Sequence, residues 1–321
     1  MLSSLIVVFS CLAANAIAEI KGPFSSHFAN WLKSNDDVYA YTLGIVDKFG
    51  ETGSFGGKMS DSEELKHNPV LFIHGNSDSA LEVEGEQWAT GWNRQIALFT
   101  AKGYSMAELY GLTYGDRNIS SSFTRKLNCN DVLGHRKFLE AILEYTQAQK
   151  VNIIAHSMGV SIARIIAKGG MIHTDDGECD VGEPMTDRID TLLGIAGANY
   201  GMCACQFATM FPACGETSGF FPGSCAIGHC NATTVIPQCA KPKYGKMLKD
   251  INDNRQREAE RIVSFYSEDD EVIGKGNMVW GKHTSYIPHS DYKKIFSKLT
   301  HGQIKTETVK EQYSVIHRHY V

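Results

Sequence analysis

The feature of this sequence that most restricts its fold is a short apolar run at residues 151–155, joined to a helix-like segment at residues 160–168 by only four residues. A bounded apolar run of this length is typical of a strand buried on both faces. The connection, His156-Ser157-Met158-Gly159, is so short that the strand has to turn sharply into the helix. This strand–turn–helix unit favours a parallel α/β sheet.

The same alternation of strand and helix patterns continues on both sides of this unit. Apolar runs predict strands at residues 69–73, 105–112, 191–196, 261–267 and 294–299. Helical spacing of apolar residues predicts helices at residues 84–102, 131–149 and 306–316. We therefore predict an α/β fold with a mostly parallel, doubly wound sheet.

The first 18 residues predict export from the cell. The apolar run at residues 5–14 is followed by Ala16-Ile17-Ala18, which fits the small-x-small rule for signal-peptide cleavage. The run is well short of the ~20 residues that span a bilayer, so a membrane anchor is the less favoured alternative. We expect cleavage after Ala18, a secreted, extracellular protein without a transmembrane anchor, and a single domain over residues 19–321.

The cysteines agree with an oxidising compartment. The chain has nine, and Cys11 leaves with the signal peptide. An even number in a secreted chain predicts up to four disulfides, whose pairing cannot be derived from the sequence. A zinc cluster is the alternative, which an oxidising compartment disfavours. The disulfide candidates are Cys129, Cys179, Cys203, Cys205, Cys214, Cys225, Cys230 and Cys239.

Six of these cysteines fall within residues 199–244, a stretch rich in glycine and phenylalanine that has no clear period. We expect a disulfide-stapled insertion there, which serves either as a lid or acyl-chain-binding cap or as a structural flap with its own small core. Its apolar side chains include Phe207, Met210, Phe211, Phe220 and Phe221. Two sequons, at Asn118 and Asn231, predict glycosylation at the surface.

Charge excludes one class of function. The 31 Lys and Arg residues against 36 Asp and Glu residues give a formal net charge of −5. A nucleic-acid binder needs a basic face, so we expect no nucleic-acid partner. The oligomeric state stays open.

The turn after residues 151–155 resembles a catalytic motif. Ala155-His156-Ser157-Met158-Gly159 fits the G-x-S-x-G nucleophile elbow, with one added methyl at the first position. Small residues are needed there because the turn is crowded. An ordinary turn with a capping serine is the alternative. In an elbow, backbone N–H groups of Met158 and of Asn76, which follows another buried strand, would form the oxyanion hole.

An acid and a histidine follow in the order that this motif requires. Residues 267–271, Ser-Glu-Asp-Asp-Glu, end a late strand, and His301 follows another strand-like run. One of the acids could orient the histidine, although a solvated turn and a surface histidine are the commoner cases. The order serine, acid, histidine is that of one hydrolase fold.

Together these residues resemble the α/β-hydrolase superfamily, and more narrowly the secreted class 2 lipases, a group of small bacterial lipases with nematode relatives. The resemblance spans most of residues 20–316. It implies Ser157 as nucleophile, Asp270 rather than Asp269 as acid, and His301 as base, in preference to the other late histidines His283, His289, His317 and His319. The segments that carry it are residues 69–76, 108–115, 152–159, 194–201 and 266–273.

The resemblance also implies the activity. We expect a secreted serine carboxylic ester hydrolase that needs no metal or organic cofactor, with triacylglycerol as the substrate that the resemblance suggests. Its partner would then be an ester or lipid substrate at a lipid–water interface. The alternatives are an inactive lipid-binding protein on the same fold, and an acyltransferase, thioesterase or peptidase with the same three residues.

Overall fold

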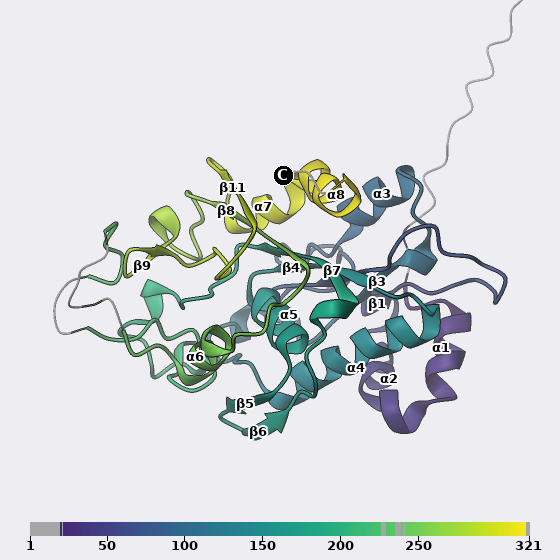
Figure 1. The fold of residues 1–321 in the computed structure, drawn as a ribbon, viewed down its shortest axis with the longest axis horizontal. Helices are drawn as coiled ribbons and strands as arrows, with labels where there is room; N and C mark the ends of the chain where they lie inside the picture. The colour runs from purple at the N-terminus through teal and green to yellow at the C-terminus, as the bar shows by residue number, and fades with distance from the viewer. Residues whose placement is uncertain (1–19, 21, 226–228, 235–238, 240–241, 319–321) are drawn as a thin grey trace, which may run out of the picture.

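A seven-stranded sheet forms the centre of the molecule (Figure 1). The structure, a computed structural model, describes residues 20, 22–225, 229–234, 239 and 242–318. The strand order is β1-β3-β2-β4-β7-β8-β11, and only β1 is antiparallel to its neighbour. The mostly parallel sheet is therefore confirmed. The strands are β1 (Ser54–Phe55), β2 (Val70–Ile73), β3 (Leu109–Leu112), β4 (Val151–His156), β7 (Ile189–Ile195), β8 (Arg261–Ser267) and β11 (Tyr292–Phe296).

Helices cover both faces of this sheet, as a doubly wound fold requires (Figure 1). One buried cluster joins Leu71 and Ile73 of β2 to the first helix set, and a second cluster joins Val70 and Phe72 to the other set. The strand alternates between the two clusters because successive side chains point to opposite faces. The first set is α1 (Ser26–Lys33), α2 (Asp36–Phe49), α4 (Cys129–Thr146), α5 (Met158–Lys168) and α6 (Lys246–Asp253); the second is α3 (Asn93–Ala101), α7 (His301–Glu307) and α8 (Val309–Arg318).

Some predicted boundaries were wrong. The helix expected at residues 84–102 begins only at Asn93, because the preceding residues turn at Gly85 and Gly91. Both glycines have positive φ, +83° and +53°, and a Cβ at Gly91 would lie 2.1 Å from the backbone nitrogen of Glu82. The expected strand at 105–112 opens with a 3₁₀ turn, Met106–Glu108, and the C-terminal helix is two helices, of which α7 begins at His301.

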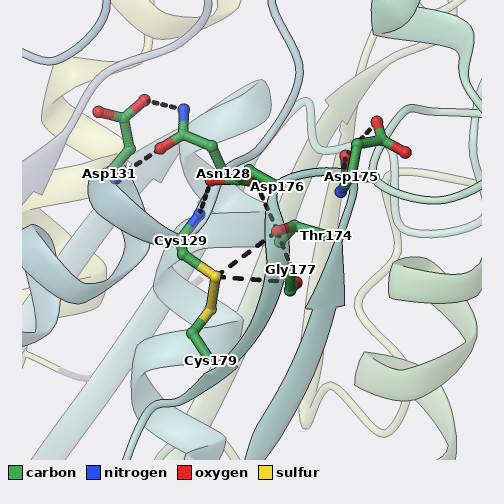
Figure 2. Close-up of a disulfide and its surroundings, with 9 residues drawn as sticks. Asn128, Cys129, Asp131, Thr174, Asp175, Asp176, Gly177 and Cys179 are labelled. Carbon is green, nitrogen blue, oxygen red and sulfur yellow. Dashed lines mark hydrogen bonds between the residues drawn. A yellow bond between two sulfur atoms is a disulfide. The ribbon is translucent and has the colours of Figure 1, made fainter.

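All eight expected cysteines form disulfides. Cys129 at the start of α4 bonds to Cys179 in the hairpin of β5 (Met171–Thr174) and β6 (Gly177–Asp180), as Figure 2 shows. The other three bonds lie within the predicted insertion, so every cysteine in the described part of the chain is in a disulfide and none is a free thiolate for a zinc cluster. Those pairs are Cys203–Cys230, Cys205–Cys214 and Cys225–Cys239.

The insertion divides its apolar side chains between core and surface. Phe220 and Phe221 are buried. By contrast, Phe207 is 86% exposed and Met210 is 73% exposed, and Phe211 is exposed beside them. The described residues of the insertion form short 3₁₀ turns, and the start of α6 and the small hairpin of β9 (Met278–Val279) and β10 (Lys282–His283) lie against them.

Within the described part of the chain, no helix combines the length and apolar character needed to cross a bilayer. The predicted signal peptide, residues 1–18, lies outside the described residues, as does His319.

Candidate active site

The predicted site residues follow strands that end at one edge of the sheet. Asn76 follows β2, Ser157 follows β4, Asp270 follows β8 and His301 follows β11. These strands are parallel, so their carboxyl ends meet at the same edge, where α/β folds place their ligands. The fold therefore brings together residues that are up to 225 positions apart in the chain, the separation of Asn76 and His301.

Ser157 occupies a strained turn. Its φ and ψ are 54° and −126°, a conformation that costs a non-glycine residue about 1–3 kcal/mol. The Ser157 N–H donates to the Ile195 carbonyl at 2.9 Å, which holds the turn against β7. A Cβ at Gly159 would lie 2.3 Å from the His74 carbonyl oxygen, so only glycine fits there. Ala155, at the other end of the motif, is buried in the core, which accommodates its methyl group.

Ser157, His301 and Asp270 form a continuous chain of hydrogen bonds. His301 Nδ1 lies 2.7 Å from Asp270 Oδ2, and His301 Nε2 lies 2.9 Å from Ser157 Oγ. A carboxylate only accepts, so Nδ1 carries the proton and Nε2 is free to accept from the serine hydroxyl. Asp270 and His301 are both buried, and Asp270 Oδ1 accepts from the backbone N–H groups of Val272 and Ile273.

The competing histidines have other surroundings. His283 lies in β10 and stacks on Tyr266, with ring centroids 5.1 Å apart. His317 lies in α8 and stacks on Tyr313 at 5.0 Å. His289 lies in the loop before β11, with a positive φ of 65°. Among the candidate histidines in the described part of the chain, only His301 forms a hydrogen bond with Ser157.

The loop after β2 contacts the serine closely. A Cβ at Gly75 would lie 2.8 Å from Ser157 Cβ, so glycine allows this approach. His74 Nδ1 donates to the Gly75 carbonyl, and its Nε2 accepts from the Tyr114 N–H at 3.0 Å. Burial lowers the His74 pKa to about 3, so the ring is neutral at pH 7. The His74 side chain therefore holds the loop in place, and Gly75 of the same loop approaches Ser157.

Each of the two expected oxyanion donors directly follows one of the residues in this contact. Met158 is the first residue of α5, and a backbone N–H at that position has no acceptor within the helix. The positive end of the helix dipole lies there as well. Asn76 follows Gly75 directly, and its side chain is held by Arg125 and by the Ser122 carbonyl at 2.9 Å.

A cavity of about 540 Å³ opens onto Ser157 and His301. Its lining includes Gly75, Asn76 and Asp78 of the loop after β2, the exposed Trp88 with Gln87 and Thr90, and Glu271 with residues of α7. None of the described residues of the insertion lines it. The cavity is large enough for an acyl chain or a short ester.

Two residues outside the expected Ser157–His301–Asp270 set contact the His301 backbone. His156 Nε2 donates to the His301 carbonyl at 3.0 Å, and burial lowers the His156 pKa well below its usual value, which keeps it neutral. Glu271 accepts from the His301 N–H at 2.9 Å. His156 and Glu271 are chain neighbours of the predicted site residues Ser157 and Asp270. No pattern in the sequence indicates that they contact the His301 backbone.

Comparisons with solved structures give distant similarities. They include a monoacylglycerol lipase from Paleococcus ferrophilus, at 14% identity, TM-score 0.43, covering 83% of this chain and 98% of that one. An alpha/beta hydrolase from the metagenome of Mar Chica lagoon sediments has 11% identity, TM-score 0.42, and coverage of 84% and 93%. A carboxylesterase structure from the thaumarchaeon Nitrososphaera gargenis has 13% identity, TM-score 0.42, and coverage of 83% and 92%.

The sequence profile of one family covers most of the chain. The family described as Lipase (class 2) matches residues 67–314, which include β2, the Ser157 turn, the insertion, β11 and α7. The expected ester hydrolase is thereby confirmed at the level of the family. The chain belongs to the class 2 lipases and is a carboxylic ester hydrolase built on a mostly parallel, doubly wound α/β sheet.

Proposed function

We propose that this protein is a secreted triacylglycerol lipase in which Ser157, His301 and Asp270 are the catalytic residues. The observation that carries the proposal is the unbroken hydrogen-bond chain from Asp270 through His301 to Ser157 Oγ. An inactive lipid-binding protein has no need of a strained serine or of a buried carboxylate aligned with it.

The geometry supports a two-step mechanism. His301 Nε2 takes the proton of Ser157 as Oγ attacks the ester carbonyl, and Asp270 stabilises the imidazolium that forms. Backbone N–H groups of Asn76 and Met158 bind the oxyanion. The alcohol leaves with the proton from His301, and water activated by the same imidazole then releases the acid from Ser157.

An exposed apolar loop in the insertion would let the protein contact a lipid–water interface. Phe207, Met210 and Phe211 project from the loop that the Cys205–Cys214 disulfide closes. Residues 202–215 contain no charged side chain. Exposed apolar patches on secreted proteins mark interaction surfaces.

This loop is connected to the oxyanion loop. Phe211 packs against the exposed Phe123, with centroids 5.7 Å apart, and the Ala213 N–H donates to the Phe123 carbonyl at 3.0 Å. The residue before Phe123, Ser122, accepts from Asn76. We propose that the loop rests on the lipid surface beside the cavity, as a fixed contact rather than as a roof over Ser157.

The secretory path is also part of the proposal. Four disulfides are typical of secreted proteins, and Asn118 and Asn231 are both exposed, as glycosylation requires. We propose cleavage after Ala18 and glycans on both asparagines. N-terminal sequencing of the secreted protein should begin at Glu19, and glycosidase treatment should lower its mass in two steps.

The substrate class is tested by rate comparison. Purified protein is offered emulsified trioleoylglycerol, tributyrin and a palmitoyl thioester, with and without an alcohol acceptor. The proposal expects free fatty acid from trioleoylglycerol as the main product. Faster thioester cleavage would favour the thioesterase, and transfer to the alcohol in preference to water would favour the acyltransferase.

A further inference from the structure

A buried ion pair joins the loop after β2, which carries Asn76, to helix α7, which begins at His301. Lys305 Nζ bonds to Asp78 Oδ2, and the two side chains are 1% and 7% exposed. The residues are 227 positions apart in the chain. Neither the family motif nor the hydrogen-bond chain at Ser157 includes this pair.

Asp78 closes the turn that holds the oxyanion donor. The Asp78 N–H donates to the Gly75 carbonyl at 3.4 Å, so Asn76 lies inside a turn that begins and ends at these residues. Asp78 Oδ1 accepts from the N–H groups of Ser79 and Gly91, at 2.9 and 3.0 Å. Its carboxylate is therefore fixed to the loop on one side and to Lys305 on the other.

Lys305 lies one helical turn after His301 on α7. A separation of four residues places both side chains on the same face of the helix. The Lys305 carbonyl accepts from the side chains of Gln95 and Gln312, both at 2.7 Å, so the backbone of α7 is held at this residue.

The ammonium of Lys305 has a complete set of partners. Besides Asp78 it donates to Thr90 Oγ1 at 3.0 Å, and it lies 4.6 Å from the centroid of the Trp92 ring. Burial lowers the Lys305 pKa, while the Asp78 carboxylate acts in the opposite direction. A buried ion pair seldom adds stability over apolar residues of the same size, so stability alone does not account for this pair.

We propose that the Lys305–Asp78 pair sets the distance between the Asn76 N–H and His301, and that both members are positioning residues for ester hydrolysis. The inference rests on the proposed function. A displacement of about 1 Å between such groups can lower the rate of the chemical step by roughly 100-fold. The loss should appear in transition-state binding and not in substrate binding.

The decisive variant is Asp78→Glu, which keeps the charge but lengthens the link by one methylene. The neutral pair Asp78→Asn with Lys305→Met removes both charges together, so that neither is left buried alone. The matched control is Glu258→Gln with Arg164→Met, another ion pair whose members are 2% and 1% exposed.

The readouts are kcat and KM on p-nitrophenyl butyrate, the affinity for a short alkylboronic acid, and the midpoint of thermal unfolding. The boronic acid forms a tetrahedral adduct with the serine and reports on the oxyanion site. In Asp78→Glu we expect kcat to fall about tenfold or more, KM to stay within about twofold, and boronic acid affinity to fall in parallel with kcat. The control should lose thermal stability but keep kcat within about threefold.

Unchanged kcat and boronic acid affinity in folded Asp78→Glu would overturn the inference, and so would an equal loss of kcat in the control pair. If the neutral pair fails to fold, Asp78→Glu decides alone, because it retains the ion pair. Wild-type protein without Ser157-dependent hydrolysis would instead refute the proposed function, so the two failures are distinguishable.

Discussion

Asp270 Oδ2 lies 2.7 Å from His301 Nδ1, whereas the adjacent Asp269 directs its Oδ2 to the backbone N–H of Lys298, at 2.6 Å. The two carboxylates therefore have different tasks, although they are neighbours in the chain. Asp270 is buried beside the imidazole, and Asp269 is exposed and holds the turn before His301.

Because the two carboxylates have different partners, we expect the same substitution to have different effects at the two positions. Asp270→Asn should lower kcat by a factor on the order of 10³–10⁴, because an amide does not stabilise the imidazolium or enforce its tautomer. Asp269→Asn, the matched control, should keep kcat within about threefold. Steady-state kinetics on p-nitrophenyl butyrate measures both. The reverse ranking would mean that Asp269 is the acid.

The contact of Gly75 with Ser157 predicts that added volume is not tolerated. Gly75→Ala places a methyl 2.8 Å from Ser157 Cβ, and Gly159→Ala places one 2.3 Å from the His74 carbonyl. Each should cost about 1–3 kcal/mol of stability and reduce activity strongly. Gly44→Ala in α2 meets no atom within 4 Å and should be neutral or slightly stabilising. Urea unfolding and esterase rates test this, and a fully active Gly75→Ala variant would contradict it.

Buried neutral histidines predict acid sensitivity. Burial lowers the pKa of His74 to about 3, below the value of about 6.5 in the unfolded chain. The unfolded state therefore binds the extra proton as the pH falls from about 6.5 towards 3, and the free energy of unfolding decreases over that window by ~1.4 kcal/mol per pH unit.

The measurement is the free energy of unfolding in urea between pH 6 and pH 4, for wild-type protein and for His74→Gln. The variant should show a slope against pH that is smaller by about one proton. Acidic groups contribute equally to both proteins, so the difference isolates His74. Identical slopes would mean that His74 is not held neutral.

The exposed loop predicts a selective loss on aggregated lipid. Phe207→Ser with Met210→Ser should lower the rate on emulsified trioleoylglycerol by about tenfold, because each side chain adds roughly 1.5–3 kcal/mol when buried and only part of that is realised at an interface. The rate on soluble p-nitrophenyl butyrate should not change. Met59→Ser is the control, since Met59 is 81% exposed on a different loop. Equal rates on emulsion in all three proteins would count against the lipid contact.

Local sequence patterns were sufficient for the central strands. Residues 151–155 and 261–267 are apolar runs of strand length, and the observed β4 and β8 match them within one residue. The two-residue β1 and the start of α3 were missed or misplaced. Their boundaries depend on contacts distant in the chain, such as the Asp78 carboxylate that accepts from the Gly91 N–H.

For the site, too, local sequence was sufficient to predict some residues but not others. Ser157 stands in a motif whose local geometry follows from its neighbours, so the sequence alone pointed to it. The choice of His301 and Asp270 depended on family resemblance, because their approach to Ser157 is produced by the order of strands in the sheet. Lys305 belongs to no motif, and His156 occupies a variable position of the elbow motif, so only their burial and partners in the folded chain reveal them.

The central claim, that Ser157 is the nucleophile of an ester hydrolase, is tested most directly by p-nitrophenol release from butyrate and palmitate esters. Wild-type secreted protein and Ser157→Ala are compared, with circular dichroism confirming that both are folded. The account predicts turnover in the wild type and at least about 10³-fold less in the variant. Equal rates in two folded proteins, at the level of uncatalysed hydrolysis or above it, would contradict it.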